Sequence, residues 1–161
     1  MIGVETDVSD EWDSRTDWPA LARRSVRAAV AHSRHAALSD SEVSVKFTSD
    51  EEVRILNQTW RGKDKATNVL SFPMADEAEL ASAQLLGDIV LAHGICAAEA
   101  AARQVGVETH AAHLVVHGTL HLLGYDHEAS DEDAEEMEAV ERRALASIGI
   151  ADPYRVSEVH P

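Results

Sequence analysis

Three histidines in the segment HGTLHLLGYDH, residues 117–127, have the type and spacing of a metal site. His117 and His121 stand at positions i and i+4, so on a helix of about 3.6 residues per turn both imidazoles lie on one face and can reach one ion. Gly124 can take the left-handed conformation that ends a helix, and the resulting turn brings His127 back toward the same point. The helix end also favours a cation, because its last carbonyl groups carry partial negative charge. The spacing therefore predicts three nitrogen ligands to one divalent cation.

The donor set indicates which ion to expect. Imidazoles without a thiolate favour Zn²⁺, although Ni²⁺, Cu²⁺ and Co²⁺ fit the same donors, and we expect one Zn²⁺ per chain. A tetrahedral zinc with three protein ligands keeps a position for water, whose pKa can fall to about 7, so that hydroxide is available at neutral pH. The alternative is a closed structural zinc with a fourth protein ligand, for which Asp126, Glu128 and His113 are the nearest candidates in sequence.

The same histidine spacing occurs in metzincin-type peptidases, whose pattern is H-E-x-x-H-x-x-G-x-x-H. In those enzymes the Glu after the first His is the general base for peptide hydrolysis. This chain has Gly118 at that position. A metallopeptidase is therefore poorly supported. The histidines outside the triad, His93, His110 and His113, are expected to be exposed or hydrogen-bonded side chains.

Length and composition describe the protein that must hold this site. The chain has 161 residues, 45% of them hydrophobic and 27% charged, which predicts one globular domain spanning residues 1–161 and excludes a disordered or collagen-like chain. No apolar run approaches the roughly 20 residues of a membrane span, and the acidic N-terminal segment is unlike a signal peptide. Cys96 is the single cysteine, which excludes an internal disulfide and a cysteine-based zinc site. We expect a cytoplasmic protein that does not bind a membrane.

The formal net charge is -15, which discourages binding to an anionic partner. The charge is uneven along the chain. Residues 15–65 carry ten of the 14 basic side chains against seven acidic ones, a local +3, whereas residues 66–161 carry four against 17, a local -13. The first half of the chain can therefore still face an anion. Seven acids between residues 131 and 141 recur at helical spacing and are expected to form the solvent-exposed face of a helix: Asp131, Glu132, Asp133, Glu135, Glu136, Glu138 and Glu141.

The elements that must position these residues follow from hydrophobic periodicity and capping signals. Strands are expected at residues 2–6, 42–47, 69–72 and 85–91, and a surface loop at 75–82. Helices are expected at 18–38, from a Ser49 cap to about residue 60, and at 93–104, 109–123 and 130–147. Strands come early and helices late. This order predicts an α+β fold, a small mixed β-sheet with helices packed on it and the metal site at the C-terminal end of a late helix.

With Gly118 in place, the string HGTLHLLGYDH resembles the signature of the YbeY family, bacterial rRNA maturation factors that are metal-dependent, single-strand-specific endoribonucleases. A second segment, LNQTWRGKDKATNVLSFP at residues 56–73, resembles that family's LN-x-x-[YW]-R-x-x-D-x-x-T-[DN]-V-L-S-F-P block. LGDI at residues 86–89 resembles its L-G-D-I strand. The three blocks stand in the expected order.

The resemblance implies an α+β fold with the metal at the base of a cleft and His117, His121 and His127 as ligands. It also implies that Arg61 faces this cleft and is needed for activity. The implied function is maturation of rRNA at the 3′ end of the small-subunit rRNA, together with ribosome quality control. RNA and ribosomal or ribosome-assembly proteins would be the partners, and DNA would not. One position departs from the pattern, because Asn68 stands where many relatives have Asp.

Arg61 also fits such a role by its chemistry, since a guanidinium holds two oxygens of one phosphate and stays cationic at any working pH. The alternative is that Arg61 is a surface residue near a helix end without a functional role. Trp60 and Cys96 are expected to serve in packing, at the core or its rim, and Asp88 is assigned no role. A metal-stabilised ribosome-assembly protein with little catalysis remains the alternative function. Whether hydroxide attacks phosphorus or deprotonates the ribose 2′-hydroxyl stays open.

Overall fold

The computed structural model describes residues 1–154, which form a four-stranded mixed sheet in the order β1-β2-β4-β3. The strands are β1 (Gly3–Val8), β2 (Glu42–Thr48), β3 (Val69–Pro73) and β4 (Leu85–Ala92). β1 pairs parallel with β2 and β2 parallel with β4, whereas β3 pairs antiparallel with β4 at the edge. The predicted α+β class with a small mixed sheet is confirmed.

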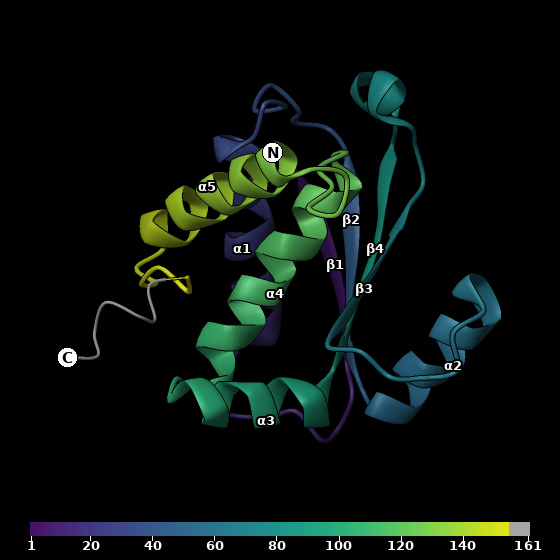
Figure 1. Cartoon of the computed structure of the whole chain (residues 1–161), viewed down its shortest axis with the longest axis vertical. Helices are drawn as coiled ribbons and strands as arrows, with labels where there is room; N and C mark the ends of the chain where they lie inside the picture. The colour runs from purple at the N-terminus through teal and green to yellow at the C-terminus, as the bar shows by residue number, and fades with distance from the viewer. Residues whose placement is uncertain (155–161) are drawn as a thin grey trace.

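Helices cover the two faces of the sheet unequally (Figure 1). α1 (Trp18–His32), α4 (Val107–Leu122) and α5 (Asp131–Ser147) lie on one face, and α2 (Asp50–Arg61) lies on the other. α3 (His93–Arg103) follows β4 directly and crosses one end of the sheet. No helix of the described part of the chain combines the length and the apolar character needed to cross a membrane.

Alternation along the strands explains this arrangement, because successive side chains point to opposite faces of the sheet. On β4, Ile89 and Leu91 belong to the main core under α1, α4 and α5. Val90 and Ala92, one position on from each, belong to a smaller cluster with Val53 of α2. The main core therefore lies between the sheet and α4, and the opposite face is only partly covered.

Capping residues decide where the helices begin and end. Ser49 accepts the backbone N–H of Glu52 as the predicted N-cap of α2, and Ser130 caps α5 in the same way by accepting the backbone N–H of Asp133. α1 ends at His32 and not near Leu38, because Ser33 turns to an extended backbone and its hydroxyl donates 2.7 Å to the Val30 carbonyl.

Two other predicted boundaries differ from the structure. The segment 75–82, predicted as a surface loop, contains a 3₁₀ helix, η1 (Glu77–Ser82). Its Leu80 is only 1% exposed and anchors the turn in the main core, which a purely polar loop could not do. α4 starts at Val107 and not at Thr109.

Candidate metal centre

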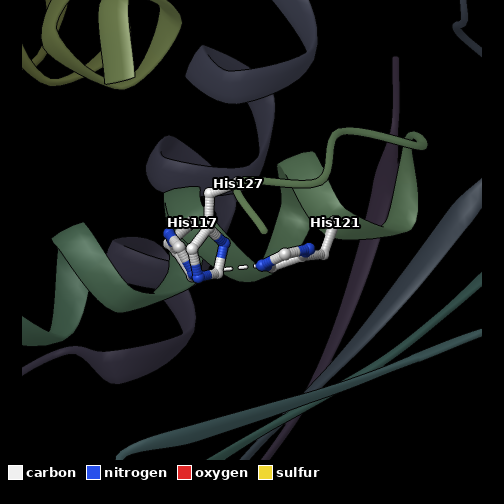
Figure 2. Close-up of side chains that lie close together, drawn as sticks. All are labelled: His117, His121 and His127. Carbon is white, nitrogen blue, oxygen red and sulfur yellow. Dashed lines mark hydrogen bonds between the residues drawn. The ribbon is translucent and has the colours of Figure 1, made fainter. Parts of the chain in front are cut away.

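The last turns of α4 and the loop after it bring the three histidines together (Figure 2). One potential ligand atom from each of His117, His121 and His127 lies within 4.8 Å of the other two. The Nε2 atoms of His117 and His121 are 3.1 Å apart, close to the separation of about 3.3 Å between two imidazole nitrogens at a tetrahedral zinc. The predicted clustering at the end of a late helix is confirmed.

Gly124 makes the turn that returns His127 to the end of α4. Its φ is 97°, in the left-handed region that favours glycine. A Cβ atom at this position would lie 2.7 Å from Oε1 of Glu77, so the end of that flexible side chain would also have to shift. The backbone conformation therefore requires glycine here, as the spacing argument expected.

The three imidazoles differ in their exposure to water. His117 and His121 are half-buried, whereas the His127 side chain is 40% exposed. Burial disfavours the charged form of His121, and together with the neighbouring His117 and His127 it lowers the pKa of His121 to about 4. The ring is therefore neutral at pH 7, which metal binding requires of an imidazole. The exposed side of the cluster leaves it open to a large substrate.

Glu141 corrects the interpretation of the acidic helix. We expected this residue on the solvent-exposed face of the helix, but its side chain is 1% exposed and accepts a 2.8 Å hydrogen bond from Nδ1 of His117. Burial acts to raise the pKa of Glu141, but the hydrogen bonds from His113 and His117 outweigh it and lower that pKa to about 2. A signal was present in the sequence. Met137, Glu141 and Leu145 recur every fourth residue and share one buried stripe of α5.

The candidates for a fourth protein ligand do not join the cluster. Nε2 of His113 faces Glu141 at 3.5 Å, and the Asp126 carboxylate accepts the backbone N–H of Glu128 at 2.9 Å. Glu128 is exposed. Within residues 1–154, the one group of three or more metal-ligating side chains is the histidine triad itself. A triad without a fourth protein ligand is the donor set of an open site, in which a further position is left for water or substrate.

Gly118 faces the sheet and not the histidines. A Cβ atom there would lie 2.9 Å from Cγ2 of Ile89 and 3.1 Å from Oγ of Ser71. The Ser71 hydroxyl also donates 3.2 Å to the Gly118 carbonyl. A glutamate at this position would meet β3 and β4, so the place of the peptidase base is closed by packing as well as by residue type.

Arg61 lies apart from the histidine cluster. It is the last residue of α2, and its Nη1 donates 3.5 Å to Oδ1 of Asn57. It lines a cavity of about 750 Å³ together with residues that include Lys46, Trp60 and Asp88. α2 itself lies on the sheet face opposite α4 (Figure 1). None of the three histidines lines this cavity. The structure therefore does not bring Arg61 and the triad into one cavity.

Three further expectations can be compared with the structure. Trp60 is 70% exposed beside Arg61, so a place in the core is wrong for it, whereas Cys96 is fully buried in the main core as predicted. Burial raises the pKa of the Cys96 thiol to about 12. Asn68 donates its side-chain N–H to both carboxylate oxygens of Glu99, at 3.1 and 3.4 Å. An aspartate there would place two carboxylates side by side, which explains the amide in this chain.

Of the three histidines expected outside the metal site, His110 and His113 are buried and His93 is half-buried, and Nδ1 of His113 has no hydrogen-bond partner among the described residues. Nε2 of His110 lies 2.7 Å from Oε1 of Glu99. The ring of His93 packs edge-on against Trp12, with the ring centroids 5.0 Å apart. The expectation that His110 is a satisfied polar side chain is therefore correct, and this histidine has no place in the cluster.

Comparison with known proteins agrees with the fold and the cluster. The family model described as endoribonuclease YbeY matches residues 6–149. Curated proteins with that name include one from Novosphingobium aromaticivorans, 50% identical over 96% of this chain and 97% of the relative. Another, from Erythrobacter litoralis, is 51% identical over 95% of each chain. A solution structure of a protein from Thermotoga maritima superposes with a TM-score of 0.57 at 25% identity, covering 97% of this chain and 100% of that one. The chain belongs to the endoribonuclease YbeY family.

Proposed function

We propose that this chain is a metal-dependent endoribonuclease that cuts single-stranded RNA, and that His117, His121 and His127 hold its one divalent cation. Membership of the family supports the reaction class. The observation that carries the site is the convergence of three imidazole nitrogens within 4.8 Å of one another. Zn²⁺ is the proposed ion, because it suits an all-imidazole donor set.

The residues present fit such a cation. His121 is neutral at working pH, and the Nδ1 atom of His117 is occupied by Glu141, so that its Nε2 atom is left for a metal. A cation held there supplies Lewis-acid chemistry, stabilising charge on phosphate oxygens and lowering the pKa of water. His117 and His121 would hold the cation from the half-buried side of the site. The side at His127 is exposed, so a phosphodiester can reach the cation there.

Arg61 is proposed as the second functional residue, in contact with an RNA phosphate. Its cavity also contains acidic side chains, namely Glu5, Asp7, Glu52 and Asp88. Lys46 is paired with Glu52 at 2.7 Å, whereas Arg61 donates a hydrogen bond to Asn57 and has no ion-pair partner among the described residues. A guanidinium without an ion-pair partner can hold two phosphate oxygens with its two parallel N–H groups. Because the triad lies across the sheet, we assign this contact to a phosphate other than the one that is cut.

The finer parts of the function rest on the family resemblance. We propose that the substrate is the 3′ region of small-subunit rRNA, that ribosomal or ribosome-assembly proteins are partners, and that the protein acts in the cytoplasm. Residues 1–161 are proposed to work as one domain. Nothing in the side chains of the triad selects one RNA sequence over another, so we expect recognition to depend on contacts outside it.

The test is a cleavage assay with the purified protein on single-stranded RNA, double-stranded RNA and a peptide, with and without a chelator. Single-stranded RNA should be cut, chelation should abolish cutting, and zinc should restore it. His117→Ala should be inactive and His32→Ala, a histidine outside the cluster, should remain active. Equal activity in His117→Ala would indicate a contaminating nuclease and would support the alternative of a metal-stabilised assembly protein. The 3′ ends of the products separate the two chemical routes, since attack by the ribose 2′-hydroxyl leaves a 2′,3′-cyclic phosphate.

A further inference from the structure

We propose that Glu141 is a positioning residue for the metal centre, which sets the ring orientation and tautomer of His117 and is itself held by Tyr154. This inference rests on the proposed metal site. It assigns a function to the one buried acid of α5, outside the set of three ligands.

The contacts of the Glu141 carboxylate use both of its oxygens. Oε2 accepts the 2.8 Å hydrogen bond from Nδ1 of His117 and lies 3.5 Å from Nε2 of His113. Oε1 accepts a 2.5 Å hydrogen bond from the hydroxyl of Tyr154. A carboxylate held at both oxygens cannot rotate freely. The imidazole bonded to it is therefore held in one orientation as well.

Packing alone does not explain an acid at this position. Glu141 occupies the buried stripe that Met137 and Leu145 fill with apolar side chains, and it is as buried as they are. Burying a carboxylate costs free energy unless it is paired and hydrogen-bonded, whereas an apolar side chain would fill the stripe without that cost. The acid is thus explained by its partners, of which His117 is the one that belongs to the histidine cluster.

The hydrogen bond fixes which nitrogen of His117 is free. A carboxylate can only accept, so Nδ1 of His117 carries the proton and Nε2 carries the lone pair. That Nε2 atom is 3.1 Å from Nε2 of His121 and faces the cluster. Partners of this kind orient metal-bound histidines, and their loss typically weakens metal affinity by about 10- to 100-fold.

The first experiment measures zinc affinity by competition with a chromophoric chelator. Glu141→Gln keeps the size of the side chain but weakens the acceptor, and it should bind zinc about 10- to 100-fold more weakly than the wild type. Glu135→Gln, an exposed acid on the same helix, should bind zinc like the wild type. Tyr154→Phe should fall between them. Equal affinity in Glu141→Gln and Glu135→Gln would overturn the proposal.

A second measurement reads the tautomer directly and does not require a stable variant. Nitrogen-15 NMR of the imidazoles in the metal-free wild type should show His117 protonated at Nδ1 and unprotonated at Nε2. In Tyr154→Phe the Nδ1 proton should exchange with water faster. The opposite tautomer in the wild type would refute the role of Glu141. A wild type that binds no zinc would instead refute the proposed metal site, so the two failures are distinguishable.

Discussion

Replacing Gly118 by alanine tests how closely α4 packs on the sheet that positions it. The added Cβ would lie 2.9 Å from Cγ2 of Ile89 and 3.1 Å from Oγ of Ser71, and the first contact is shorter than real Cβ atoms adopt. Ile89 is fully buried in the main core and cannot move aside into solvent. The helix must therefore shift away from β4, carrying His117 and His121 with it.

Two opposing effects set the size of the change in stability. Alanine is favoured over glycine inside a helix by about 0.8–1 kcal/mol. Overpacking a well-filled core costs about 1–3 kcal/mol. The balance is a net loss of about 1 kcal/mol, which corresponds to a drop of about 3 °C in Tm for a domain of this size. If there were free space around position 118, Gly118→Ala would instead stabilise the protein.

The assay is urea unfolding of Gly118→Ala in the presence of a chelator, alone and in an Ile89→Ala background. Removing the Ile89 side chain deletes the opposing methyl group, so the alanine at position 118 should become neutral or stabilising in that background. A stabilisation of about 1 kcal/mol by Gly118→Ala in the wild-type background would show that the close approach of α4 to the sheet is wrong.

Three other predictions concern Arg61, Cys96 and His110. Arg61→Lys keeps the charge but loses the two-pronged contact, so kcat/KM for RNA should fall about 10- to 100-fold while Tm stays nearly unchanged. If the variant instead melted early and had full activity when cooled, Arg61 would be a structural residue. Cys96 should not react with a thiol reagent at pH 8 until urea unfolds the protein, because it is buried and its pKa is raised to about 12; labelling of the folded protein would contradict this. Burial lowers the pKa of His110, so the folded state resists protonation of this side chain. Its contribution to the free energy of unfolding is therefore complete above about pH 6.5 and is lost as the pH falls below that value. The loss of stability between pH 7.5 and 5.5 should be smaller in His110→Gln, and equal losses would refute the assignment.

Local patterns were enough to predict the histidine cluster. Its geometry depends on the i, i+4 spacing of His117 and His121 and on the turn at Gly124, all within one short segment. The strands predicted at residues 42–47 and 85–91 were likewise local signals, because one alternates and the other is an apolar run. The end of α1 was missed, since a serine side chain and an extended backbone at residue 33 ended the helix where periodicity continued.

Long-range packing decided what local patterns could not. Glu141 was predicted to be exposed together with the other acids of its helix. Its burial depends on the packing of α5 against α4. Arg61 stands within the block of residues 56–73 that resembles the family, but the placement of α2 on the far face of the sheet separates it from the triad. Spacing along the chain carries no information about which face of the sheet a helix covers, so the place of Arg61 relative to the triad could not be derived from the sequence.

The central claim is that His117, His121 and His127 hold the one cation that RNA cleavage requires. The most direct test is elemental analysis of the purified protein and of a variant carrying both His117→Ala and His121→Ala. Cleavage of single-stranded RNA is measured on the same samples. The wild type should contain about one zinc-sized ion per chain, and the variant should lose both the ion and the activity while keeping its secondary structure. Unchanged metal content in the variant, or full cleavage without the ion, would contradict the claim.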